Sequence, residues 1–166
     1  MLAIGIDPGT ATTGYGLVRL TPDGDLVRVD HGVIRTESKQ PMGDRLAELH
    51  RAVAALIERH HPDTAAVEKL YIQRNVGTAL WVGQARGVVV LALAQAGLPI
   101  GEYAPREVKL AISGYGAAGK RQMQEMVRAL LQMEALPRPD DAADALAVAI
   151  CHLHSQRIRD RVEAAG

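Results

Sequence analysis

Residues 2–9 read LAIGIDPG, an apolar run that closes on Asp7 and is followed by Pro8 and Gly9. The run predicts a buried strand, and the two residues after Asp7 predict a turn. An ionised carboxylate beside isoleucine is strongly disfavoured unless it is paired, hydrogen-bonded or bound to a metal. Asp7 is therefore either a plain strand-end residue or part of a functional site, where Gly9 would let a phosphate or metal approach the backbone.

Three more carboxylates stand in similarly apolar settings. Glu68 ends the run TAAVE, and Asp141 and Asp144 lie in PDDAADALA, which predicts the start of a helix with Asp140 as its N-cap. Acids three apart share a helix face, although the helix dipole also favours acids there, and Glu68 could simply pair with Lys69. Oxygen ligands without Cys or His suit Mg²⁺ or Mn²⁺. We interpret the four acids as a divalent-metal site.

Outward from residues 2–9, the chain predicts a single α/β domain over residues 1–166, with a flexible tail after about residue 157. Three antiparallel strands are expected first, and the later segments alternate between helix and strand. The predicted strands cover 2–7, 13–20, 25–36, 64–68 and 98–104, and the predicted helices cover 43–61, 75–97, 105–113, 120–133 and 139–162. We interpret this order, βββαβαβα plus a further helix, as a three-layer sandwich.

The cysteine content and the apolar stretches of the sequence indicate the cellular compartment of this domain. Cys151, the single cysteine, lies in ALAVAICHL and is expected to be a buried, reduced thiol. The start MLAIGID lacks a signal pattern, and Arg86 and Gln95 interrupt the most apolar stretch before it reaches membrane-spanning length, so we expect a cytoplasmic protein with no membrane partner. Gly83 and Gly87, four apart in the 75–97 helix, predict a helix that is buried centrally or shared with a second subunit.

Net charge is zero, but it is unevenly distributed. Residues 69–128 carry eight basic and three acidic side chains, whereas both flanking segments are net acidic. A cationic segment beside a carboxylate cluster would suit a phosphodiester substrate, although an ordinary solvated surface would look the same. Tyr71 could stack on an unpaired base or merely cover the core. The candidate phosphate contacts are Arg74, Lys109, Lys120 and Arg121.

Two further patterns are rejected as sites. Residues 114–120, GYGAAGK, match GxxxxGK, but Arg121 stands where a P-loop has Ser or Thr, and the loop follows a predicted helix instead of a strand. The six histidines have no metal-ligand spacing, and His152 and His154 point to different faces of a helix.

The ordered motifs IGIDPGTATTGYG, AVEKLYIQRN, GQARGV, PREVKLAISGYGAAGK and DDAADALAVAICH span nearly the whole chain, which resembles the RuvC family of bacterial Holliday junction resolvases. The resemblance implies a ribonuclease H-like fold with a five-stranded mixed sheet. It also implies a homodimer that nicks two opposed strands of a four-way DNA junction in recombination and repair. Mg²⁺, with Mn²⁺ able to substitute, would bind twice per active site, and the branch-migration proteins RuvA and RuvB would be partners.

By position, the family's catalytic acids match Asp7, Glu68, Asp141 and Asp144. Some members have histidine at the position of Asp141. Tyr71 falls where the family commonly has phenylalanine, and Lys109 and Lys120 match lysines implicated in DNA binding and catalysis. Hydrolysis would leave 5′-phosphate and 3′-hydroxyl ends, with Lys120 stabilising charge on the phosphoryl oxygens.

Other functions remain as alternatives at this point. A different ribonuclease H-like nuclease would cut RNA–DNA hybrids or flaps, and a non-catalytic protein would only bind junctions. Actin-like ATPases and sugar kinases share an Asp-Pro-Gly-Thr pattern near the start, but they need two such domains and a far longer chain.

Overall fold

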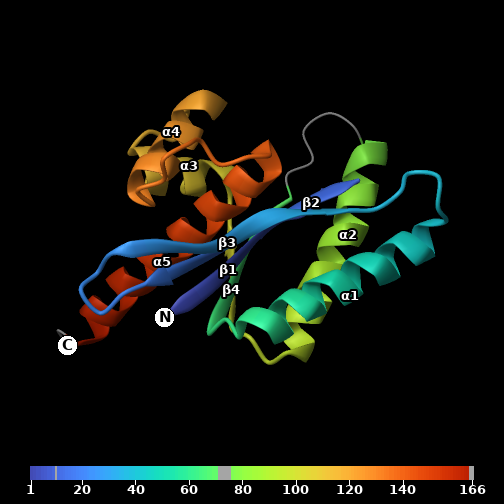
Figure 1. Cartoon of the computed structure of the whole chain (residues 1–166), viewed down its shortest axis with the longest axis horizontal. Helices are drawn as coiled ribbons and strands as arrows, with labels where there is room; N and C mark the ends of the chain where they lie inside the picture. The colour runs from blue at the N-terminus through green and yellow to red at the C-terminus, as the bar shows by residue number, and fades with distance from the viewer. Residues whose placement is uncertain (10, 71–75, 165–166) are drawn as a thin grey trace.

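A five-stranded mixed sheet forms the centre of the molecule, with helices on both faces (Figure 1). The computed structural model describes residues 1–9, 11–70 and 76–164. Strands β1 (Leu2–Asp7), β2 (Thr12–Leu20) and β3 (Leu26–Arg35) pair antiparallel. Strand β4 (Thr64–Glu68) runs parallel to β1, and β5 (Ile100–Tyr103) runs parallel to β4, giving the order β3-β2-β1-β4-β5.

In the described part of the chain, the helices lie in two layers, one on each face of the sheet (Figure 1). Helices α1 (Met42–His60) and α2 (Val76–Gln95) form the first layer. The second layer contains α3 (Pro105–Ser113), α4 (Lys120–Leu130) and α5 (Asp140–Ala164). The three-layer α/β sandwich is confirmed, and the order βββαβαβααα in the described residues contains a helix at each of the five predicted helical ranges. Helix α5 continues through the segment expected to be a tail, where its side chains are exposed.

Strand β1 is buried on both faces, which explains its continuous apolar sequence. Ile4 and Ile6 pack toward α1 and α2, whereas Ala3 belongs to the core under α5. In the parallel pair, Ile6 lies opposite Val67, so Asp7 and Glu68 follow at the same edge of the sheet. The fold thereby brings together two acids that are 61 residues apart in sequence.

Helix α5 lies unusually close to β1 and β2 because glycines face it. A Cβ atom on Gly5 would lie 2.3 Å from the carbonyl oxygen of Ala145, and one on Gly14 would lie 1.9 Å from that of Asp141. Any side chain there would push the helix away from the sheet. These glycines therefore hold the first turns of α5, with Asp141 and Asp144, against the strands that lead to and from Asp7.

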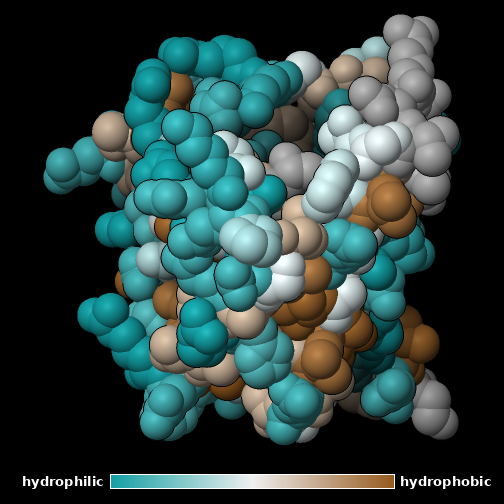
Figure 2. Space-filling model, turned by 90° about the vertical axis from the view of Figure 1, so that its right-hand side faces the viewer, coloured by the Kyte–Doolittle hydropathy of each residue, from teal (hydrophilic) through white to brown (hydrophobic). Residues whose placement is uncertain are grey.

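Helix α2 is a surface helix, so the prediction of a centrally buried helix is wrong. It buries Val89 and Leu93 against the core but leaves Leu80, Trp81 and Leu91 45–63% exposed. Figure 2 shows hydrophobic residues gathered on this side of the molecule. The helical segment Gly77–Gln95 is long and apolar enough to cross a membrane, by length and composition only. The expectation that Arg86 interrupts the apolar stretch before it reaches this length is therefore wrong. However, the Arg86 guanidinium is ion-paired with Glu102, beside strand β4.

Candidate active site

Asp7 and Glu68 face a cavity at the carboxyl ends of β1 and β4. The cavity has a volume of about 360 Å³. Helix α2 closes one side of it, and the first residue of α3 closes another. Its lining residues are Asp7, Pro8, Glu68, Lys69, Leu70, Val82, Arg86 and Pro105. The two strand-end acids are half-buried here.

Helices α4 and α5 bring a lysine and the remaining acids to the same edge of the sheet. The Lys120 Nζ atom lies 3.1 Å from Asp140 Oδ2 and 3.8 Å from Asp144 Oδ2. Asp140 is the first residue of α5, and its Oδ1 atom accepts a hydrogen bond from Gln124 Nε2 at 2.8 Å. The predicted N-cap role of Asp140 is therefore wrong, because its carboxylate joins α5 to side chains of α4.

The charges of the four acids act on one another. The pKa of Asp7 is raised to about 7, first by burial and then by the negative charges of Glu68, Asp144 and Asp141, with Lys120 opposing them. The pKa of Glu68 is also raised to about 7, by burial and by Asp144, against the positive charge of Lys109. Burial likewise raises the pKa of Asp144. Asp7 is therefore close enough to Glu68, Asp141 and Asp144 to feel their negative charge, and Lys120 offsets part of it.

The donor set suits a hard divalent cation. Carboxylate oxygens are the preferred ligands of Mg²⁺ and Mn²⁺, and a cation would favour the ionised forms that burial disfavours. Within residues 1–9, 11–70 and 76–164, no three His, Cys, Asp or Glu side chains are placed so that together they could hold a metal ion. The acids interact electrostatically without forming a metal-binding group in this structure, and Lys120 lies beside Asp140 and Asp144.

The candidate DNA contacts have different surroundings. Lys109 is close enough to lower the pKa of Glu68, and it lines an open cavity of about 830 Å³ together with Lys69 and Arg106. Arg121 is 72% exposed and pairs with Glu125 along α4 at 2.9 Å. Tyr71 and Arg74 lie outside the described residues, so their predicted roles stay predictions.

Arg86 is a site residue that sequence reasoning missed. Its Nε atom donates to the carbonyl oxygen of Glu68 at 3.3 Å, and its guanidinium also pairs with Glu102. These two interactions connect helix α2 to the end of strand β4, where Glu68 lies. The only signal in the sequence was its place in the GQARGV motif, which says nothing about the partner that it meets in space.

Other features of the sequence have structural explanations. A Cβ atom on Gly9 would lie 2.1 Å from the carbonyl oxygen of Thr12, so this glycine is already required by the turn after β1. The GYGAAG loop joins helix α3 to helix α4, with Gly114 in a left-handed conformation, which confirms that it is not a P-loop. Cys151 is a buried free thiol, as predicted.

Comparison with known proteins gives matches over nearly the whole chain. The family model described as crossover junction endodeoxyribonuclease RuvC matches residues 3–152. A protein with this name from Chloroflexus aurantiacus is 57% identical over 155 residues, covering 93% of this chain and 94% of the relative. Another from Desulfitobacterium hafniense is 52% identical over 162 residues, covering 98% of both chains.

Solved structures agree with these matches. The Thermus thermophilus RuvC structure superposes with a TM-score of 0.88 and 35% identity, covering 95% of this chain and 96% of the other. T. thermophilus RuvC in complex with Holliday junction substrate gives a TM-score of 0.87 and 32% identity over the same shares.

Proposed function

The chain belongs to the RuvC family of crossover junction endodeoxyribonucleases, and from this we propose that Asp7, Glu68, Asp141 and Asp144 form the centre with which it nicks four-way DNA junctions. The enzyme is a ribonuclease H-like phosphodiester hydrolase that resolves Holliday junctions. The observation that supports the site assignment is the packing of β1 beside β4 and of the start of α5 against β2, which brings Glu68, Asp141 and Asp144 close enough to raise the pKa of Asp7.

The four acids would hold two Mg²⁺ ions, or Mn²⁺ in their place. When bound, such ions would favour deprotonation of a water and neutralise charge on the leaving oxygen. Asp7 would be a ligand shared by the ions, because the other three acids are near enough to raise its pKa, and Glu68 and Asp144 would complete the ligands. Asp141 would ligate or orient the attacking water. Attack of the water oxygen on phosphorus breaks the bond to the 3′ oxygen, which leaves 5′-phosphate and 3′-hydroxyl ends.

Lys120 would stabilise negative charge on the phosphoryl oxygens. Its ammonium group is already held beside Asp140 and Asp144, so it need not reorganise when charge develops. Lys69, Lys109 and Arg106 line the open cavity next to the acids, where they could hold the DNA backbone. Base stacking by Tyr71 and phosphate binding by Arg74 and Arg121 complete the proposed DNA contacts.

A nicking assay with three substrates tests this function. We expect metal-dependent, symmetric nicking of a mobile four-way junction, and little cutting of linear duplex or RNA–DNA hybrid. Preferential cutting of the hybrid would instead indicate a different ribonuclease H-like nuclease. Junction binding without any metal-dependent product would indicate a non-catalytic binding protein.

Homodimerisation through α2 is part of the proposal, because two opposed cuts require two active sites. The exposed apolar side chains of Leu80, Trp81 and Leu91 support this face as the contact, since large exposed apolar groups mark protein interfaces. The same helix lines the acid cavity with Val82 and Arg86, so a dimer contact on α2 would lie close to both sites.

Recruitment by RuvA and RuvB and a cytoplasmic location also belong to the proposal. Both rest on membership of the family. Co-purification of the full chain with each branch-migration protein, with and without junction DNA, would test the recruitment.

A further inference from the structure

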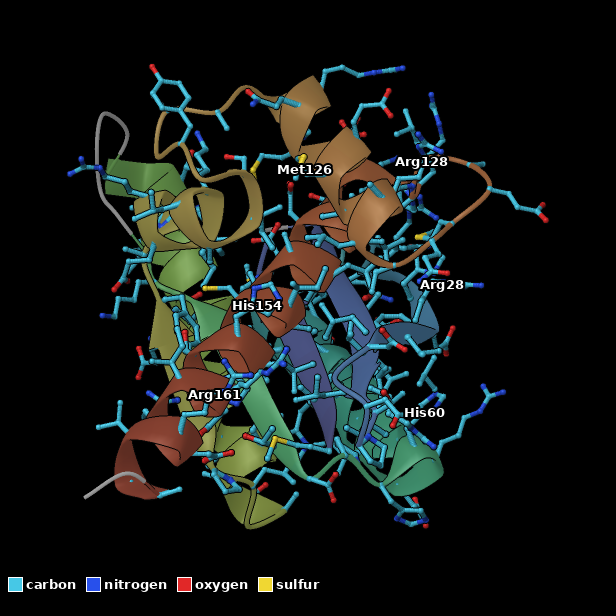
Figure 3. The ribbon with its side chains drawn as sticks, turned by 90° about the vertical axis from the view of Figure 1, so that its left-hand side faces the viewer. Arg28, His60, Met126, Arg128, His154 and Arg161 are labelled. Atoms are coloured by element: carbon cyan, nitrogen blue, oxygen red, sulfur yellow. The ribbon has the colours of Figure 1, made fainter. Side chains whose placement is uncertain are left out.

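A buried histidine links the helix that carries two of the acids to the strand that carries a third. His152 lies on α5 and is 1% exposed. Its Nε2 atom lies 2.7 Å from Thr64 Oγ1, and its Nδ1 atom lies 2.8 Å from the Tyr103 hydroxyl. Helix α5 crosses the sheet on the side that faces the viewer in Figure 3, where His154 marks this part of the helix. Both ring nitrogens of His152 therefore have partners in the sheet.

The donor and the acceptor of each hydrogen bond around His152 can be assigned. Thr64 Oγ1 donates its hydrogen to the carbonyl oxygen of Pro99 at 3.1 Å, so it must accept from His152 Nε2–H. A neutral imidazole then has its lone pair on Nδ1, which accepts from the Tyr103 hydroxyl. Burial, with help from Arg159, lowers the pKa of His152 to about 4, which agrees with a neutral ring. Every polar hydrogen in the chain of bonds is used once.

The backbone leaves room for this ring in one place. A Cβ atom on Gly101 would lie 2.5 Å from His152 Nδ1, so β5 accepts the imidazole only because this residue is glycine. The ring also meets Tyr103 edge to face, with centroids 5.7 Å apart. The position of α5 along β5 is thus fixed by both shape and hydrogen bonding.

One partner of His152 lies on the strand that carries Glu68, and the other lies on the neighbouring strand. Thr64 begins β4, and Tyr103 lies directly opposite Glu68 in the β4–β5 register. The carbonyl oxygen of Tyr103 also accepts from the backbone N–H of Lys69 at 2.8 Å. On α5, His152 is eight residues from Asp144, about 12 Å along a continuous helix.

We propose that His152 is a positioning residue that, through Thr64 and Tyr103, fixes helix α5 relative to strands β4 and β5 and thereby sets the spacing between Asp144 and Glu68. The inference rests on the proposed function, because that spacing matters only if the two acids share a substrate or metal. A histidine that merely filled the core would contribute to stability without affecting how the acids act together.

The test compares Tyr103→Phe with a destabilised control. Tyr103→Phe removes one hydroxyl and keeps the ring, and Thr64→Val is a second variant should the first not fold. Val53→Ala is the control, because Val53 is fully buried on α1, on the opposite face of the sheet. Mn²⁺ binding to the protein is followed by electron paramagnetic resonance of the free ion, and nicking of a four-way junction is measured over the same Mn²⁺ range.

We expect Tyr103→Phe to weaken Mn²⁺ binding and to raise the Mn²⁺ concentration for half-maximal nicking, each by about fivefold. Excess Mn²⁺ should restore the rate, and junction affinity should stay within about twofold of the wild type. Val53→Ala should lower the melting temperature without changing metal dependence. If Tyr103→Phe and Thr64→Val both bind Mn²⁺ as tightly as the wild type, the positioning role is overturned. A wild type without metal-dependent nicking would overturn the proposed function as well, which separates the two failures.

Discussion

At the scale of single residues, the site holds carboxylates where their charge is disfavoured. Burial and neighbouring acids raise the pKa values of Asp7 and Glu68 to about 7. Between about pH 4 and pH 7, Asp7 and Glu68 each keep a proton in the folded protein that the same side chain has released in the unfolded chain. The stability of the metal-free protein therefore falls as the pH rises through this window, and the loss is complete above pH 7.

Asp7→Asn should stabilise the metal-free protein at pH 8, because the neutral amide removes a buried charge that other acids repel. We expect its melting temperature to exceed that of the wild type by several degrees at pH 8 and to approach it at pH 5. Mg²⁺ should raise the melting temperature of the wild type more than that of the variant. Calorimetry at both pH values provides the measurement.

Asp23→Asn is the matched control, because Asp23 lies exposed in the turn between β2 and β3. It should show the melting temperature of the wild type at both pH values. Equal melting temperatures for Asp7→Asn and the wild type at pH 8 would show that Asp7 is not under electrostatic strain.

Sequence reasoning could identify the acids one by one but could not supply their neighbours. Asp7 and Glu68 end apolar runs, so their residue types and settings were visible in the chain. The Asp140–Lys120 pair and the Arg86 bond to Glu68 depend on how helices α2, α4 and α5 pack, which no local pattern encodes. The N-cap prediction for Asp140 was wrong for this reason: α4 offers its carboxylate better partners.

At the scale of elements, the contact between α5 and the sheet determines the geometry of the site. Gly14→Ala would place a methyl carbon on the carbonyl oxygen of Asp141, so the helix or the strand must move. We expect a loss of at least about 3 kcal/mol in the free energy of unfolding, together with loss of nicking. Gly43→Ala on α1, where a Cβ meets nothing within 4 Å, should stay within about 1 kcal/mol of the wild type. Urea unfolding measures both, and a Gly14→Ala protein of normal stability would contradict the close packing.

Adjacent residues on α4 allow catalytic charge to be separated from surface charge. Lys120 faces Asp144, whereas Arg121 pairs with Glu125 along the exposed side. Lys120→Met should lower kcat on a four-way junction about 100-fold. Arg121→Met should leave kcat unchanged and weaken junction affinity by at most about threefold. Single-turnover nicking and gel-shift titration give the two quantities, and equal effects of both substitutions on kcat would remove Lys120 from the proposed chemistry.

At the scale of the whole molecule, α2 shows why an apolar helix is ambiguous in sequence. Its composition predicts burial, a subunit contact or even a membrane span, and these differ only in what covers the outer face. The fold leaves Leu80, Trp81 and Leu91 exposed while Val89 and Leu93 reach the core. Central burial is thereby excluded, and a contact with a second copy of the chain stays a prediction.

Replacing both Leu80 and Leu91 with Gln should dissociate the proposed dimer. Light scattering after size exclusion should give twice 17.8 kDa for the wild type at micromolar concentration and 17.8 kDa for the double variant. Val162→Gln is the control, because Val162 is equally apolar and is exposed on α5. A monomeric wild type under these conditions would contradict the paired-cut proposal.

Four acids from β1, β4 and α5 are proposed to act together on a four-way junction. The most direct measurement is nicking of a mobile four-way junction by the wild type and by Asp7→Asn, with Mg²⁺ and Mn²⁺ compared and junction binding measured in parallel. We expect the wild type to give symmetric ligatable nicks, and Asp7→Asn to be at least about 1000-fold slower with near-normal binding. An Asp7→Asn protein that cuts at the wild-type rate would contradict the account.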